Sequence, residues 1–247
     1  MQGAPRDLET YARLRQLVRR NRGVYAAVQL IKYGPLVGFR RRSARAALLR
    51  RGARNHWRML NLGSGGRRHP AMVNVDITPI TGPDVVADGY ALPFRDGTFH
   101  LICCESVVEH VVDPERFLSA VTRTLGAAGI IYLEVPFLQP MHSLPDDFTR
   151  WTRAGFIDAA RRAGLVVVES GMDMGPGSAC FWILSEWLAL AICCGSRRVQ
   201  RVVRYLLRWF LAPLLLSDLL FGNFSVSEEL ASSFFFVARR MDDGSCA

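Results

Sequence analysis

The chain has 247 residues, half of them apolar, which is enough to bury the core of one α/β domain of ordinary size with some additions. Its formal net charge is +9, yet residues 1–58 alone hold 15 Arg or Lys and only two acids, so the rest of the chain is net acidic. The six cysteines include no C-x-x-C spacing, which excludes a recognisable zinc or disulfide framework and favours a reduced, cytoplasmic setting.

Residues 1–56 are predicted to form a basic arm of one or two amphipathic helices. Short apolar patches such as 24–31 and 36–39 alternate with arginine clusters at 19–22 and 40–42. Arginines recur throughout, and no apolar run of suitable length follows a short basic start, so the arm is not a signal peptide. Three interpretations stay open: contact with an anionic membrane surface, contact with RNA, or a solvated helical cap on the core.

A predicted strand near 57–63 runs into a glycine turn, residues 63–66, with the sequence Gly-Ser-Gly-Gly. Strands near 71–77 and 84–87 then end at Asp76 and Asp88. Ligands of open α/β sheets lie beyond the carboxyl ends of the strands, and glycines let the backbone approach a ligand closely. We therefore expect a nucleoside-bearing cofactor at this edge of the sheet.

The spacing within this region disfavours a dinucleotide. Asp76 follows Gly63 by only 13 positions, which leaves room for about one turn of helix. A pyrophosphate would lose its partner at a helix N-terminus, which disfavours NAD and FAD as cofactors. A cofactor with an amino-acid tail in place of phosphates needs only backbone groups from the glycine turn.

The remaining pattern alternates strands with helices, which predicts a parallel sheet built from βαβ units. Asp113 and Pro114 are expected to begin a helix, and Gly126 and Gly129 to bracket the turn after it. Strands are predicted near 99–104, 128–135, 165–170 and 232–239, and helices near 90–93, 113–124 and 151–163.

The run from Asp84 to Pro136, with its LPFRDGTF and EHV segments, resembles the core of class I S-adenosylmethionine-dependent methyltransferases, particularly small-molecule enzymes. The similarity extends from about Met59 to about Ser170. It implies an α/β, Rossmann-like, mostly parallel seven-stranded sheet whose last strand is antiparallel, and S-adenosyl-L-methionine as the cofactor.

The resemblance also implies which residues bind the cofactor. Gly63, Ser64 and Gly65 would lie against its methionine part. Asp76 would bind the ribose, with Ile77 beside it, and Asp88 with Gly89 would bracket the adenine. Glu105 and Ser106 would line the pocket. The family usually has an acid two residues before the first glycine, where this chain has Asn61, whose amide oxygen can still bond the methionine amino group.

Residues 172–231, called the insert below, stand where similar enzymes have a short connection before the last strand. The methyltransferase domain is thus predicted over 57–247 with this helical, hydrophobic insert inside it. Residues 180–194 are almost wholly apolar but too few to cross a bilayer. Arginines at 197, 201, 204 and 208 predict a basic amphipathic helix whose arginines reach lipid headgroups while its apolar face sinks into the interface. The alternatives are a hydrophobic lid over the substrate or a contact between two copies of the chain.

The polar loop at 136–152 follows the fifth strand and offers the best residues for chemistry. His142 is the candidate general base or substrate contact, because an imidazole titrates near neutral pH. Asp146, Asp147 and Arg150 are candidate substrate contacts. In the alternative interpretation, one of the two aspartates caps the next helix and His142 is a solvated loop residue. No cluster of Asp and Asn with suitable spacing is visible, so no metal site is predicted.

These observations predict an enzyme that methylates a hydroxyl, or alternatively a carbon, of a glycan, a lipid-linked or another amphiphilic small molecule. Two alternatives remain: a quinone or polyketide methyltransferase, and a degenerate methyltransferase fold acting as a membrane-associated scaffold. Nucleic acid is a disfavoured partner, because the N/D-P-P-Y/F element of many amino-group methyltransferases is replaced by Cys-Glu-Ser-Val at 104–107. The expected location is cytoplasmic, with possible attachment to the inner face of the membrane, and a homo-oligomer stays possible.

Overall fold

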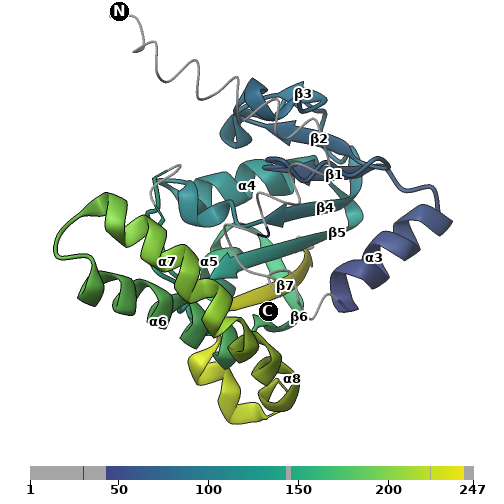
Figure 1. Ribbon diagram of the computed structural model, residues 1–247. Coiled ribbons are helices and arrows are strands. Elements are labelled where there is room, and N and C mark those ends of the chain that lie inside the picture. The colour runs from purple at the N-terminus through teal and green to yellow at the C-terminus, as the bar shows by residue number, and fades with distance from the viewer. Residues whose placement is uncertain (1–29, 31–42, 143–145, 223, 242–247) are drawn as a thin grey trace, which may run out of the picture.

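A computed structural model describes residues 30, 43–142, 146–222 and 224–241 of the chain. Its centre is a seven-stranded sheet in the order β3-β2-β1-β4-β5-β7-β6 (Figure 1). Strand β7 is antiparallel to both of its neighbours, and the other pairs are parallel. The predicted fold class is confirmed. The strands are β1 (Met59–Leu62), β2 (Val73–Asp76), β3 (Val85–Val86), β4 (Phe99–Glu105), β5 (Leu125–Pro136), β6 (Leu165–Met174) and β7 (Ser233–Arg240).

Helices cover both faces of this sheet and continue into the insert. The α-helices are α3 (Ser43–Arg54), α4 (Pro114–Thr124), α5 (Arg153–Arg162), α6 (Pro176–Ile192), α7 (Arg197–Leu211) and α8 (Ser217–Phe221). Short 3-10 turns are η1 (Pro79–Thr81), η2 (Gly89–Ala91), η3 (Val108–His110), η4 (Ala212–Leu216) and η5 (Ser225–Leu230).

One face of the sheet is covered by α4 and α5. Asp113 caps α4 by accepting a hydrogen bond from the backbone N–H of Arg116 at 3.1 Å, and Pro114 occupies the first turn, as the sequence predicts. The apolar side of α4, including Phe117 and Leu118, is buried in the main core. Burial of this stripe fixes the helix on the sheet.

The opposite face is covered by α3, the part of the basic arm that the structure describes. Leu48 and Leu49 of α3 pack on Met59 and Leu101, and Tyr132 belongs to the same cluster. This stretch of the arm is therefore a helix on the core. The other predictions for the arm fall on residues 1–29 and 31–42, outside the described residues.

Strand β5 differs from the sequence prediction at its start. It begins at Leu125, directly after α4, so Gly126 and Gly129 lie within the strand and not in a turn. A Cβ on Gly126 would lie 3.4 Å from the carbonyl oxygens of Gly97 and Phe99, where the register with β4 shifts. The glycine lets two backbones approach closely at this irregularity.

The insert leaves the sheet at one place. Met174 at the end of β6 pairs with Ser233 at the start of β7, and Pro136 at the end of β5 pairs with the same residue. Residues 172–174 of the predicted insert lie in β6, so the insert of the structure is residues 175–232, which extend from the carboxyl edge of β5 on the side where α6 and α7 lie in Figure 1. Asp218 caps α6 with hydrogen bonds from the backbone N–H groups of Gly175, Gly177 and Ser178.

An ion cluster lies between α6 and α7, and both helices expose many apolar side chains, although α6 also buries Phe181 and Ala189. Glu186 of α6 accepts hydrogen bonds from Arg204 at 3.1 Å and Arg208 at 3.0 Å, and the Arg208 guanidinium also stacks over Trp182. The prediction that all four arginines of α7 reach outward is wrong for these two, because Glu186 lies opposite them. The outward surface holds apolar side chains 37–81% exposed: Ile183, Leu184, Trp187, Leu190, Ile192, Val199, Val202, Leu206, Trp209 and Phe210.

None of the helices in the described part of the chain is both long enough and apolar enough to span a bilayer.

Candidate active site

The glycine turn lies at the carboxyl end of β1, where the sequence predicts it. Gly63 and Gly65 have positive φ angles of 66° and 49°. A Cβ on Gly63 would lie 2.2 Å from Val107, whereas a Cβ on Gly65 would meet only a carbonyl oxygen at 4.0 Å. Gly63 is thus needed for packing, and Gly65 leaves space open above the turn.

Asp76 holds this turn in place. One carboxylate oxygen accepts a hydrogen bond from Gly65 N–H at 2.7 Å, and the other accepts one from Thr78 N–H at 3.0 Å. The side chain is buried and is not among the residues that line the pocket beside the turn. Each oxygen keeps a free lone pair. A contact with a ribose is compatible with these bonds and stays a prediction.

A pocket of about 170 Å³ lies against the turn. Residues 63–67 form one side, and Arg45, Asn61, Glu105 and Ser106 form the rest. The structure thus brings together six of the ten predicted cofactor residues: Asn61, Gly63, Ser64, Gly65, Glu105 and Ser106. Ser106 has a φ of 53°, a strained conformation for a residue with a Cβ that is common at functional sites.

The Ser64 hydroxyl is the clearest sign that this pocket receives a polar ligand. Ser64 is 3% exposed, and its Oγ has no hydrogen-bond partner in the described part of the chain. A buried hydroxyl without a partner is costly. The amino-acid end of the expected cofactor would supply one, so the residues present fit that group.

Asn61 is fixed as an amide by its neighbours. Its Nδ2 donates to the Arg67 carbonyl and to Asn74 Oδ1, both at 3.0 Å. Asn74 is held in turn by Asp84, which accepts from its backbone N–H and its Nδ2. These bonds hold the pKa of Asp84 below its usual value, and the bond from the Asn74 backbone N–H has the largest effect. Asn61 itself lines the pocket.

Arg45 of α3 is a pocket residue that the sequence analysis missed. Its guanidinium forms an ion pair with Glu105, and both side chains are mostly buried. Burial lowers the pKa of Arg45, but the Glu105 carboxylate outweighs it, so the net shift is upward and the charge is secure. Arg45 has no distinguishing signal in a segment with so many arginines.

Ile77, predicted beside the ribose, and Asp88 and Gly89, predicted around the adenine, lie outside this pocket. Asp88 is exposed, and its carboxylate accepts a hydrogen bond from Tyr90 N–H at 2.9 Å, which caps η2. Gly89 has a packing role, because a Cβ there would lie 2.3 Å from the Phe117 ring. Ile77 is 70% exposed. Their contacts with a cofactor stay predictions.

A second polar group, the His–Glu cluster, lies at the carboxyl ends of β4 and β5 and comprises Glu109, His110 and His142. The Nε2 atoms of the two histidines are 3.2 Å apart, and Glu109 Oε1 is 3.8 Å from His110 Nε2. Glu109 is 1% exposed, and its Oε2 has no hydrogen-bond partner in the part of the chain that is described. Burial raises the pKa of Glu109 to about 7.

His142 reaches this cluster from the loop after β5, held by Asp147. The Asp147 carboxylate lies 3.2 Å from His142 Nδ1 and also accepts from the His142 backbone N–H. Burial lowers the pKa of His142, and Asp147 only partly offsets this. Because Nε2 faces His110, both ring nitrogens of His142 already have a neighbour.

Asp147 and Arg150 are bound to each other. The two form a two-pronged ion pair, and Arg150 donates further to the carbonyls of Gln139, Pro140 and Thr149. Asp146 is exposed, and its carbonyl lies 2.8 Å from His110 Nδ1. These three residues brace the loop in the structure, and their predicted contacts with substrate stay untested.

Comparison with known proteins places this geometry in a family. Residues 66–133 match the family described as "Methyltransferase domain". No curated protein matches the chain significantly. A chain in the complex between the Haloferax volcanii Trm112 methyltransferase activator and a putative methyltransferase superposes with a TM-score of 0.51 at 15% identity, covering 92% of this chain and 97% of that one.

A putative sarcosine dimethylglycine methyltransferase from Galdieria sulphuraria superposes with a TM-score of 0.50 at 13% identity, covering 81% and 86% of the two chains. Identities this low show a shared fold. The family match covers the segment from the glycine turn to the fifth strand, and the sheet order agrees with it. Residues 66–133 thus mark a methyltransferase domain in this chain, and the sheet has the fold that these enzymes share.

Proposed function

We propose that this methyltransferase acts on a hydroxyl of an amphiphilic small molecule, such as a glycan or lipid-linked compound, at an anionic membrane surface. The observation that carries the proposal is the outward apolar surface of α6 and α7 beside the carboxyl edge of the sheet. Many large apolar side chains exposed on two adjacent helices are typical of a surface that binds a partner or a membrane.

The pocket beside the glycine turn suits the methionine end of the cofactor. When bound, the cofactor supplies a methyl group on a sulfonium. Arg45 is the cation for its carboxylate, Asn61 Oδ1 and Glu105 are acceptors for its amino group, and Ser64 Oγ can bond either one. Asp76, Ile77 and Asp88 follow along the same edge of the sheet, where the ribose and adenine would extend.

The acceptor side is formed by the loop after β5 and is tied to the insert. The backbone N–H groups of Phe137 and Leu138 donate to the carbonyls of Ser232 and Ala231 at 2.9 and 3.3 Å. A substrate with a polar head at the His–Glu cluster and an apolar tail would therefore meet the insert next. Asp146, Asp147 and Arg150 shape the loop around that head.

A hydroxyl acceptor must lose its proton during transfer, and His142 is the side chain placed for contact with it. To act as general base, His142 would have to release His110 or Asp147, since both of its ring nitrogens are engaged. Its role therefore depends on what else enters the His–Glu cluster.

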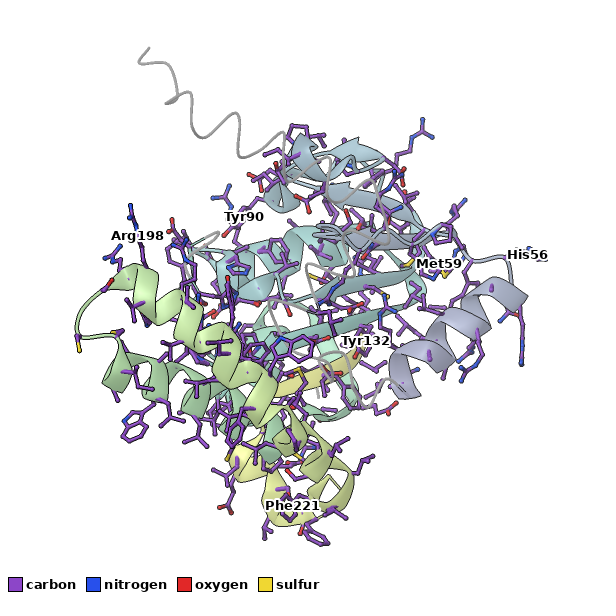
Figure 2. The ribbon with its side chains drawn as sticks, viewed as in Figure 1. His56, Met59, Tyr90, Tyr132, Arg198 and Phe221 are labelled. Atoms are coloured by element: carbon purple, nitrogen blue, oxygen red, sulfur yellow. The ribbon has the colours of Figure 1, made fainter. Side chains whose placement is uncertain are left out.

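The lipid surface is favoured by the charges next to the apolar face. Arg197, Arg198 and Arg201 are exposed at the start of α7, and Figure 2 shows Arg198 at the outer tip of that helix. Arginines beside an apolar face can bind headgroup phosphates while the apolar side chains enter the acyl region. The cytoplasmic leaflet is the anionic one.

Two binding experiments test the proposal. The wild type should co-sediment with anionic vesicles and less with zwitterionic ones, and Phe210→Asp should weaken this binding without changing the melting temperature. Glu229→Asp, an exposed change elsewhere in the insert, is the matched control. Equal vesicle binding by the wild type and Phe210→Asp would contradict the proposed membrane contact. If the wild type self-associates and does not bind vesicles, the apolar surface is a contact between two copies of the chain.

In the second experiment, S-adenosylhomocysteine is titrated into the protein in a calorimeter. The wild type should bind it and Asp76→Ala should bind it far more weakly, with Asp96→Ala, a 73% exposed acid away from the pocket, as the control. No heat from the wild type would favour the scaffold alternative. Methyl transfer to extracted apolar quinones without vesicles would favour the quinone alternative.

A further inference from the structure

The His–Glu cluster joins two segments that are far apart in sequence. Glu109 and His110 belong to η3 after β4, and His142 belongs to the loop after β5. One ligand atom from each of the three residues lies within 4.8 Å of the others. The rings of His110 and His142 stand nearly perpendicular, at 88°, with their centroids 4.9 Å apart.

The neighbours of the two Nδ1 atoms favour the same tautomer in both histidines. His110 Nδ1 lies 2.8 Å from the Asp146 carbonyl oxygen, which can only accept, so Nδ1 carries the proton. His142 Nδ1 faces the Asp147 carboxylate at 3.2 Å and carries its proton for the same reason. In the neutral rings, both Nε2 atoms therefore present a lone pair.

These two lone pairs meet at an N···N distance of 3.2 Å. Two acceptors at that distance repel each other unless a proton or a metal ion lies between them. Zinc–imidazole bonds of about 2.0–2.1 Å in a tetrahedral site place two ligand nitrogens about 3.3–3.4 Å apart. The observed N···N separation is close to this value, and the unpartnered Glu109 oxygen is a third possible ligand atom beside the two nitrogens.

We propose that Glu109, His110 and His142 bind a divalent metal ion of the zinc class. Two imidazole nitrogens and one carboxylate are a usual donor set for Zn²⁺, and three protein ligands leave a coordination position open. The Asp146 carbonyl and the Asp147 carboxylate are the outer partners that hold the two rings in the ligating orientation. No metal was predicted from the sequence, because the ligands come from two separate segments.

The role of this metal rests on the proposed function. A hydroxyl oxygen of the acceptor takes the open position, where the ion lowers its pKa and the proton leaves to water. That oxygen then forms the bond to the methyl carbon, and the carbon–sulfur bond breaks with its electron pair remaining on sulfur. His142 acts here as a ligand, which replaces the general-base role.

The test measures metal binding alone, without cofactor or acceptor. Full-length protein freed of metal by a chelator is titrated with Zn²⁺ by calorimetry and with Co²⁺ by absorption. The wild type should bind one ion. His142→Ala should lower the affinity by at least about 100-fold, because loss of a ligand should cost no less than loss of a residue that only orients a ligand, which costs up to about 100-fold. His142 is 44% exposed at its side chain, so this variant should melt as the wild type does.

His100→Ala, which removes an exposed histidine elsewhere, is the matched control and should leave the affinity unchanged. The Co²⁺ spectrum should lack a thiolate charge-transfer band, which separates the site from binding by the exposed Cys180 and Cys194. No saturable binding by the wild type, or equal affinity in His142→Ala, would overturn the metal site and leave the vesicle and S-adenosylhomocysteine titrations unaffected. A protein that binds zinc here yet methylates no hydroxyl would overturn only the proposed function.

Discussion

At the scale of single residues, the neighbours of a side chain decide its chemistry as much as its type does. Asn61 stands where the family usually has an acid, and its two hydrogen bonds go to acceptors, the Arg67 carbonyl and Asn74 Oδ1. A carboxylate cannot donate to either. The amide is therefore required by the network behind the glycine turn, and the pocket receives its oxygen.

Changing Asn61 to Asp should destabilise the protein although the family often has an acid there. The substitution removes two hydrogen bonds and sets a carboxylate against two acceptors in a buried site, which should lower the free energy of unfolding by about 1–3 kcal/mol. Urea unfolding at neutral pH measures the change. Asn55→Asp, at an exposed position, is the control, and equal stability of the two variants would contradict this account of Asn61.

Arg45 gives a second prediction for a single residue. Arg45→Ala should weaken S-adenosylhomocysteine binding by about tenfold or more, because one charged hydrogen bond contributes about 1.5–3 kcal/mol. Methylthioadenosine lacks the carboxylate, so its affinity should be unchanged. Arg50→Ala on the exposed side of the same helix is the control. An equal loss for both ligands would show that Arg45 shapes the pocket and does not bind the carboxylate.

At the scale of elements, α6 and α7 enclose an ion cluster and expose many large apolar side chains. Their charged residues Glu186, Arg204 and Arg208 face each other, and the apolar side chains face outward. Packed helices in water normally bury the apolar stripe. An ion cluster inside and apolar groups outside suit a helix pair that is covered by lipid or by another apolar surface.

Glu186→Gln tests the part played by this ion cluster. The change keeps the side-chain volume but removes the carboxylate charge that Arg204 and Arg208 face, so the free energy of unfolding should fall by about 1–3 kcal/mol, less than for a fully buried pair. Glu229→Gln, an exposed acid in η5, is the control. Thermal melting measures both variants, and equal melting temperatures would mean that the cluster adds nothing to the packing of α6 on α7.

At the scale of the whole molecule, the insert can be removed without breaking the sheet. Met174 and Ser233 are paired neighbours in the sheet, so the insert begins and ends at one point. The cofactor pocket lies at β1 and β4, on other strands. The fold should therefore tolerate the loss of the insert.

Replacing residues 175–232 with Asn-Gly, a favoured two-residue hairpin turn, should give a folded protein that still binds S-adenosylhomocysteine. It should lose most of its binding to anionic vesicles. Circular dichroism, calorimetry and co-sedimentation measure the three properties. If the shortened protein still binds vesicles as the full chain does, the basic arm and not the insert carries the lipid contact.

The sequence by itself determined the strand order along the chain, the glycine turn with Asp76 and the amphipathic helices, because each depends on local spacing and periodicity. The tertiary structure decided the rest. Arg45 meets Glu105 across 60 positions, His142 meets His110 across 32, and the arginines of α7 turn toward Glu186. Contacts between distant segments depend on how the sheet and helices pack, and a one-dimensional pattern carries no record of which side chains then come within bonding distance.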